Sequence, residues 1–94
     1  QACNAAFCNR TTGSGSTVST VTATKVGANR GVVGFFEVFI AGKNYTGPTT
    51  SADVSVLTLN KDVGKSQVCL RFFARTTGGG FVEVGTAQCT KAPY

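Results

Sequence analysis

The side chains that could carry acid–base chemistry are few. The chain of 94 residues has no histidine, and its only carboxylates are Glu37, Asp53, Asp62 and Glu83. Histidine is the commonest general base and the commonest metal ligand, so its absence weakens both roles. Glu37 and Glu83 could share a sheet face, but such a face is flat in the expected architecture. A glycosidase needs two carboxylates that face one cleft. We therefore expect no enzymatic activity, no catalytic residue and no cofactor.

Two further patterns that could bind ligands are more simply explained as structure. The run Gly78-Gly79-Gly80 is followed by strand-forming residues, whereas a phosphate-binding loop leads into the N-terminus of a helix. We therefore interpret it as a hairpin loop. Asp53 and Asp62 stand alone, whereas a calcium loop needs clustered oxygen ligands. We expect no metal site.

The four cysteines, Cys3, Cys8, Cys69 and Cys89, favour disulfides over zinc. Cys3 and Cys8 loosely fit the spacing of a zinc ligand pair, but Cys69 and Cys89 lie too far apart in the sequence to form the second pair. A domain of this size buries only about 60–65% of the surface its unfolded chain exposes, so covalent cross-links are a common aid. We predict two disulfides.

Several features favour secretion. Disulfides persist in oxidising compartments, and the sequence begins without a methionine or an apolar leader, as expected of a mature product after signal-peptide removal. Asn9-Arg10-Thr11 and Asn44-Tyr45-Thr46 are N-glycosylation sequons, so Asn9 and Asn44 are candidate glycan sites. No apolar run approaches the roughly 18–20 residues of a membrane span. We expect an extracellular protein without a transmembrane segment.

The composition predicts an all-β domain. Valine, threonine and phenylalanine are abundant, 12 glycines punctuate the chain, and no segment has helical periodicity. We expect one domain over residues 1–94, in which residues 1–16 form a disulfide-looped, flexible lead-in. Gly42-Lys43 fits a two-residue type II′ turn. The predicted strands are Thr17–Val26, Val32–Ala41, a short strand from Asn44 to Gly47, Asp53–Asn60, Ser66–Arg75 and Phe81–Cys89.

The last two predicted strands form a hairpin whose register can be tested. If the loop is centred on Gly79, Cys69 lies opposite Cys89, where a cross-strand disulfide can form. The same register places Arg75 opposite Glu83 and Phe73 opposite Gly85. We therefore predict the disulfide Cys69–Cys89 and, by elimination, Cys3–Cys8.

Alternation then assigns the two faces of each strand. The predicted core residues are Phe36, Val38, Ile40, Val68, Leu70, Phe72, Ala74, Val82 and Val84. The opposite face carries Phe35, Glu37, Phe39, Arg71, Phe73, Arg75, Phe81 and Glu83. This second set is unusual because it places four phenylalanines among two arginines and two glutamates.

Over residues 18–90 the layout resembles a fibronectin type III or immunoglobulin-like sandwich. GFFEVFI is similar to the third strand of that family, and VSVLTLNKDVGKSQVCLRFFA is similar to its fifth and sixth strands. GGGFVEVGTAQC is similar to the last strand. The family's core tryptophan has no counterpart here, and Val68 stands where a tyrosine is expected. The resemblance implies a small antiparallel β-sandwich, with other small β-barrels as the alternative, and binding rather than catalysis.

The phenylalanine-rich face is the leading candidate for a binding surface. Aromatic residues and arginine are enriched at interface hot spots, and an exposed aromatic patch usually marks a contact surface. The candidate binding residues are Phe35, Phe39, Arg71, Phe73, Arg75 and Phe81. The partner is an extracellular protein or a second copy in a homodimer. The alternative is that the N-terminal segment or a loop covers this face as a second small core.

The charge suggests two other readings. The net charge is +5, and the basic residues are Arg10, Lys25, Arg30, Lys43, Lys61, Lys65, Arg71, Arg75 and Lys91. Such a protein could bind an anionic cell-surface polysaccharide, although dispersed lysines also serve solubility. The sequence has no stripe of basic residues with interleaved aromatics, so we expect no nucleic-acid binding. A small secreted effector, toxin or inhibitor is the remaining alternative, with the turn Gly42-Lys43-Asn44-Tyr45 as its contact loop unless a glycan on Asn44 blocks it.

Overall fold

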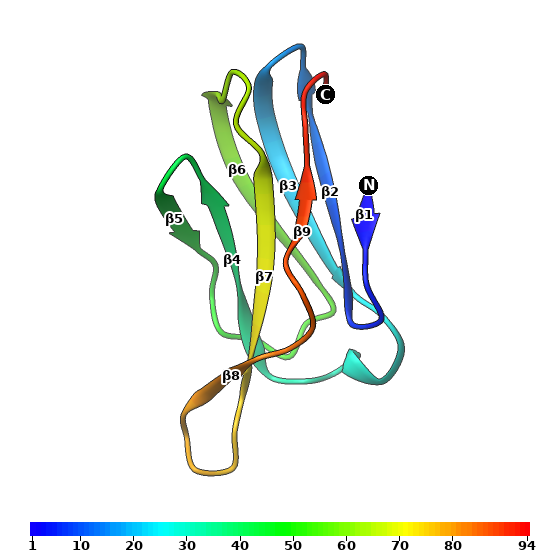
Figure 1. Ribbon diagram of the computed structural model, residues 1–94. Coiled ribbons are helices and arrows are strands. Elements are labelled where there is room, and N and C mark those ends of the chain that lie inside the picture. Colours follow the sequence, from blue (N-terminus) through cyan, green and yellow to red (C-terminus); the bar gives the residue numbers. More distant parts are fainter.

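Alternating β-branched and aromatic residues form nine strands, and helical structure is limited to one 3-10 turn, η1 (Gly27–Asn29). The computed structural model describes residues 1–94, the whole chain (Figure 1). The strands are β1 (Ala2–Cys3), β2 (Phe7–Ser14), β3 (Thr17–Lys25), β4 (Gly34–Ile40), β5 (Lys43–Thr46), β6 (Val54–Asp62), β7 (Val68–Arg75), β8 (Phe81–Glu83) and β9 (Gln88–Thr90).

The strands form two antiparallel sheets that pack as a sandwich. One sheet has the order β1-β2-β3-β6, and the other has the order β5-β4-β7-β8, with β9 also paired to β7. Every strand pair is antiparallel. The predicted all-β antiparallel sandwich with two disulfides is confirmed.

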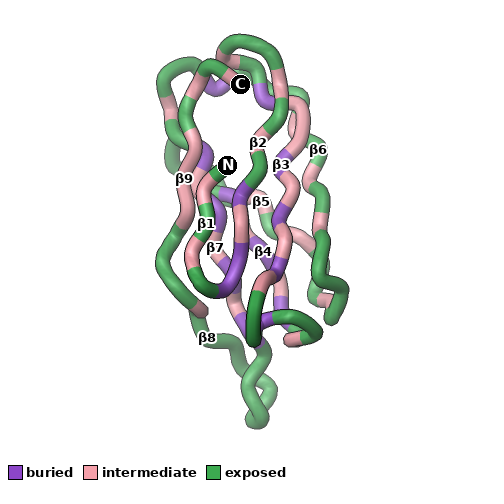
Figure 2. Tube along the Cα trace, turned by 90° about the vertical axis from the view of Figure 1, so that its right-hand side faces the viewer, coloured by how far each residue is buried: buried purple, intermediate pink, exposed green.

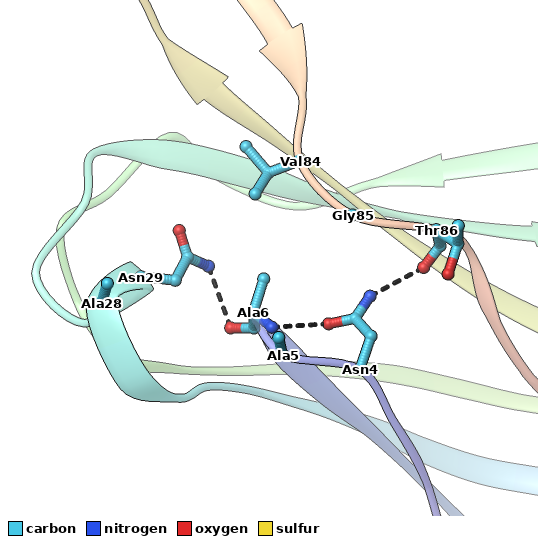
Figure 3. Close-up of a pocket in the computed structure, with 8 residues that line it drawn as sticks. All are labelled: Asn4, Ala5, Ala6, Ala28, Asn29, Val84, Gly85 and Thr86. Carbon is cyan, nitrogen blue, oxygen red and sulfur yellow. Dashed lines mark hydrogen bonds between the residues drawn. The ribbon is translucent and has the colours of Figure 1, made fainter.

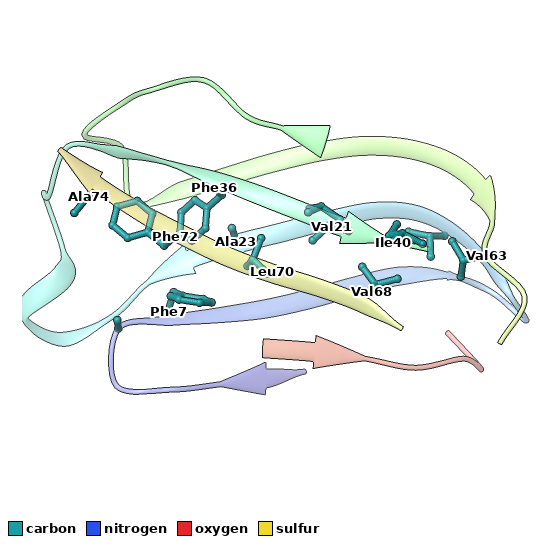
Figure 4. Packing of buried hydrophobic residues seen from close by; sticks show 13 residues of the cluster. Phe7, Val21, Ala23, Phe36, Ile40, Val63, Val68, Leu70, Phe72 and Ala74 are labelled. Atoms are coloured by element: carbon teal, nitrogen blue, oxygen red, sulfur yellow. The ribbon is translucent and has the colours of Figure 1, made fainter. Parts of the chain in front are cut away.

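The core lies between the sheets and draws on both of them (Figure 4). Its largest fully buried apolar side chains include Phe7 from β2, Val21 from β3, Phe36 from β4, and Leu70 and Phe72 from β7. The ring of Phe7 meets the ring of Phe36 edge-on at 5.7 Å, and Phe36 packs on Phe72 at 4.7 Å. Figure 2 shows buried stretches, drawn in purple, in strands of both sheets of an elongated molecule. Aromatic packing therefore joins the two sheets.

The predicted faces of β4 and β7 are confirmed, since Phe36, Val38, Ile40, Val68, Leu70, Phe72 and Ala74 are all buried. The prediction for Val82 is wrong, because this side chain is 53% exposed. Figures 1 and 2 show that the β7–β8 hairpin extends past the end of the sandwich. Val82 therefore has no opposite sheet to pack against.

Both predicted disulfides, Cys3–Cys8 and Cys69–Cys89, are present, and no cysteine is free. The predicted register of the last hairpin is confirmed at Cys69–Cys89 but is wrong nearer the loop. Cys69 does pair with Cys89, but Arg75 lies opposite Phe81 rather than Glu83, and Phe73 lies opposite Glu83 rather than Gly85. The predicted continuous strand is interrupted between β8 and β9, where Gly85 adopts a positive φ of 73°. The residues in this interruption shift the register.

The N-terminal region also differs from the expectation. The sequence predicts a lead-in over residues 1–16, whereas the structure places β1 and β2 there, with Phe7 paired to Lys25 and Thr12 to Thr20. This strand shows no apolar alternation because its inward-facing positions after Phe7 are polar or glycine, including the buried Asn9. The β4–β5 turn is Ala41-Gly42 with φ values of 49° and 82°, a type I′ geometry, in place of the predicted type II′ turn on Gly42-Lys43.

Candidate functional site

An aromatic cluster lies on the outer surface of the five-stranded sheet. Phe35 on β4 and Phe73 on β7 are direct cross-strand partners, and their rings stack with centroids 5.2 Å apart. Phe81 on β8 meets Phe35 edge-on at 4.9 Å. These contacts follow from the register, because they bring outward-facing positions of three adjacent strands together. We call this surface, defined by Phe35, Phe39, Arg71, Phe73, Arg75 and Phe81, the aromatic–arginine face.

Arg71 forms the polar centre of this face. It lies opposite Glu37 on β4, with Nη1 3.6 Å from that carboxylate, and its Nε and Nη2 donate to Glu83 at 3.1 and 3.3 Å. Its guanidinium also lies 5.0 Å from the centre of the Phe73 ring. The hydrogen bond to Glu83 raises the pKa of Arg71, with further support from the charges of both glutamates. One cation therefore holds both carboxylates of the face.

The remaining members of the face are spread around this centre. Phe39 is 40% exposed and lies opposite Cys69, next to the Cys69–Cys89 disulfide. Arg75 lies in the hairpin opposite Phe81, is exposed, and makes no ion pair. The structure thus brings Phe35, Arg71, Phe73 and Phe81 into one contact network, with Phe39 at one end of the face and Arg75 at the other.

No other segment of the chain covers this face. The alternative was that the N-terminal segment covers the aromatic–arginine face. The strands of that segment, β1 and β2, instead pair within the opposite sheet. Phe81 remains 45% exposed, and Phe35 and Phe73 are half-buried by one another. The reading as a second, internally covered core is therefore wrong.

The two predicted glycan sites have opposite environments. Asn9 has no exposed surface, and its Nδ2 donates to the carbonyls of Val68 and Gln88 at 3.1 and 2.9 Å. A glycan is attached through that nitrogen, so the prediction of a glycan at Asn9 does not fit the folded chain. Asn44 is exposed and lies opposite Phe39, at the border of the aromatic–arginine face.

The turn proposed as an inhibitory loop is accessible in part. Lys43 and Asn44 are exposed, whereas the hydroxyl of Tyr45 accepts a hydrogen bond from Lys61 Nζ at 2.6 Å. This bond ties β5 to β6 across the open side of the sandwich. The turn is therefore a short, braced hairpin.

A pocket that the sequence did not suggest lies at the other end of the sandwich (Figure 3). It has a volume of about 530 Å³ and lies between the Cys3–Cys8 turn, η1 and the β8–β9 connection. Asn4 Oδ1 accepts from the N–H groups of Ala6 and Phe7, its Nδ2 donates to the Thr86 carbonyl, and Asn29 Nδ2 donates to the Ala6 carbonyl. Asparagine's ability to cap local backbone was the available signal, but the pairing to Thr86 depends on tertiary structure.

Asp62 and Lys25 are the two other groups with shifted pKa values, and both make structural hydrogen bonds. Asp62 Oδ1 accepts from the Gly64 N–H and the Ser16 hydroxyl, and these bonds lower its pKa. Lys25 is buried, donates to the carbonyls of Val32 and Thr50, and has a pKa lowered by loss of solvation. No three metal-ligating side chains cluster.

No helix in the structure has the length and apolar character needed to cross a membrane. No protein-family model, no curated protein and no solved structure matches this chain.

Proposed function

We propose that the chain is a secreted, non-enzymatic recognition module that binds another extracellular protein through the aromatic–arginine face. The observation that supports this most is the partly exposed aromatic cluster of Phe35, Phe73 and Phe81, with Arg71 over the Phe73 ring, on a sheet face that no segment covers. Rings held by one another lose little freedom on binding, so such a surface is preorganised for contact. Aromatic residues and arginine are also the residue types that dominate interface energies.

The charge pattern favours a neutral or acidic protein surface as the partner. Both glutamates of the face are held by Arg71, which leaves Arg75 as its unpaired charge. The chain also carries a net charge of +5. An apolar patch bordered by carboxylates would complement this arrangement and would approach faster than a basic surface. An anionic polysaccharide draws less support, because the central cation is already held by two carboxylates.

Secretion and family kinship are part of the same proposal. Two disulfides are typical of extracellular domains of this size. Kinship with fibronectin type III or immunoglobulin-like domains is supported by the strand arrangement. β3 and β6 lie in one sheet, and β4, β7 and the last strands lie in the other, as the family's second and fifth strands separate from its third, sixth and seventh.

Selection from a random peptide display library on the wild-type chain alone, followed by binding measurements on Phe81→Ser, tests the proposal. We expect the enriched peptides to pair apolar with acidic residues and to bind Phe81→Ser at least about tenfold more weakly, the usual effect of losing a contact hot spot. Val54→Ser, on the opposite sheet, is the matched control and should bind them as the wild type does. Peptides that bind Phe81→Ser equally well would contradict the proposal. Selective retention of polygalacturonate or heparin would favour the polysaccharide alternative.

A further inference from the structure

We propose that the free edge of β6 pairs antiparallel with β6 of a second copy, forming a homodimer with one continuous eight-stranded sheet. This interface lies on the sheet opposite the aromatic–arginine face and does not depend on the function proposed for that face. β6 ends the sheet β1-β2-β3-β6, so one of its edges has no partner within the chain.

The backbone of β6 presents a regular set of unpaired groups. The Lys25 N–H bonds the Asp53 carbonyl at 2.7 Å, which fixes the phase of the alternating β3–β6 ladder. In that phase Ser55 and Leu57 direct their backbone groups to β3, whereas Val54, Val56 and Thr58 direct theirs to the open edge. A strand is the occupant that satisfies such a row of N–H and C=O groups.

The features that usually block an edge strand are missing from this stretch. Residues 54–58 contain no charge, proline or glycine, and the Val54 and Val56 side chains are 54% and 58% exposed. Features that block pairing at this edge begin only after residue 58, where Asn60 has a positive φ of 49° and Lys61 donates a hydrogen bond to Tyr45. The open edge is therefore a short, apolar window centred on Val56.

A groove beside this window extends the surface toward the core. It has a volume of about 490 Å³, and every residue that lines it is uncharged, including Phe36, Pro48 and Leu57. An uncharged strand with alternating apolar side chains fits an edge bordered by such a groove. The first five residues of β6, Val-Ser-Val-Leu-Thr at positions 54–58, have that chemistry, which makes a second copy the matching partner.

Self-complementarity also fixes the register. When Val56 lies opposite Val56 of the partner subunit, Val54 lies opposite Thr58 of the partner subunit. By symmetry, Thr58 lies opposite Val54 of the partner subunit. All three outward-directed residues then form hydrogen-bonded pairs, with two N–H···O bonds in each pair. A two-fold axis at Val56 makes this contact isologous and closed, as in most homodimers. The same register places Leu57 of the partner subunit beside Ser55 at the groove.

Light scattering over a concentration series tests the dimer. We expect the mass of the wild type to rise from 9.7 kDa toward about twice that value, and Val56→Lys to stay at 9.7 kDa because two lysines would meet at the axis. Thr46→Lys, which adds the same charge to the edge strand of the other sheet, should dimerise normally. A wild type that remains at 9.7 kDa up to millimolar concentration overturns the proposal, as does a Val56→Lys variant that dimerises normally.

Cysteine cross-linking tests the register and does not rely on Val56→Lys remaining folded. Under mild oxidation Val56→Cys should form a covalent dimer through residue 56. The similarly exposed Val54→Cys should not, because position 54 faces Thr58 of the partner subunit and not a second cysteine. Peptide mapping verifies that the two native disulfides are intact. Equal cross-linking of both variants, or of neither, overturns the register. A dimer lost with Phe81→Ser but kept in Val56→Lys overturns the edge interface and assigns self-association to the aromatic–arginine face.

Discussion

Phe35 and Phe73 lie directly opposite each other on β4 and β7, and their rings stack at an interplanar angle of 20° on the outer surface of the sheet. An exposed stack between adjacent strands stabilises the sheet and also shapes its surface. The two roles can be separated by measuring stability and binding on the same variants.

The stack should appear as a coupling energy in a double-mutant cycle. Phe35→Leu and Phe73→Leu each keep an apolar side chain but lose the ring-to-ring contact. We expect them to couple by about 0.5–1.5 kcal/mol in urea unfolding, the range for aromatic pairs. The pair Phe39→Leu and Phe73→Leu is the control and should be additive. Additivity in the Phe35–Phe73 cycle would mean that the rings contribute only their buried area.

Gly34 allows the close approach of β4 and β7 that makes this stack. A Cβ at position 34 would lie 2.2 Å from the Phe73 carbonyl oxygen and 2.6 Å from the Phe72 ring. We expect Gly34→Ala to lower the free energy of unfolding by about 3 kcal/mol, the upper part of the range for overpacking. Gly78→Ala in the hairpin loop, where a Cβ meets nothing within 4 Å, should change it by less than about 0.5 kcal/mol. Equal effects of the two substitutions in thermal or urea unfolding would contradict this reading.

The two disulfides should contribute unequally to stability. Cys69–Cys89 closes a loop with a sequence separation of 20, and Cys3–Cys8 one of 5. Chain-entropy estimates give about 3 kcal/mol for the longer loop and about 2 kcal/mol for the shorter. We therefore expect the double variant Cys69→Ala/Cys89→Ala to melt at a lower temperature than Cys3→Ala/Cys8→Ala. The reverse order in calorimetry would show that local packing outweighs loop closure.

Asp62 should make stability depend on acid pH. Its pKa is lowered from 3.8 by the hydrogen bonds from Gly64 and Ser16, so the folded state binds its proton less readily than the unfolded state does. The stabilisation is therefore complete above pH 3.8 and is lost as the pH falls through the folded-state pKa. We expect wild type to melt above Asp62→Asn at pH 7 and the difference to shrink toward pH 2. A difference that does not change with pH would remove Asp62 as its source.

How much of the fold the sequence predicts depends on where apolar alternation is visible. The faces of β4 and β7 follow from GFFEVFI and VCLRFFAR, because one of every two residues there is buried. Alternation also gathers the phenylalanines on one face, whereas the pairing of Cys69 with Cys89 comes from a hairpin register that holds at the disulfide but not near the loop. The strongest predictions therefore concern these two strands and the candidate site that they carry.

The features that the sequence misses depend on backbone and tertiary contacts. β2 pairs with β3 through its backbone, but after Cys8 its residues are polar or glycine on both faces, so this part of the strand resembles a linker. The interruption at Gly85 shifts Glu83 from Arg75 to Arg71, a change that cross-strand charge pairing alone does not distinguish. The burial of Asn9 depends on β7 and β9, which are distant in sequence.

Asn9 should behave as a structural residue and not as a glycan site. Its side chain crosses from β2 to the opposite sheet, donates to two backbone carbonyls, and accepts a hydrogen bond from the Thr11 hydroxyl at 2.9 Å. Asn9→Ala would leave those carbonyls without their donor, and we expect it to lower the free energy of unfolding by about 2–3 kcal/mol. Thr11→Ala also destroys the sequon but keeps the Asn9 amide, so it should cost about 1 kcal/mol or less. Mass spectrometry of the folded protein secreted from eukaryotic cells should find any glycan on Asn44 and none on Asn9. A folded fraction carrying a glycan on Asn9 would contradict the burial of that amide.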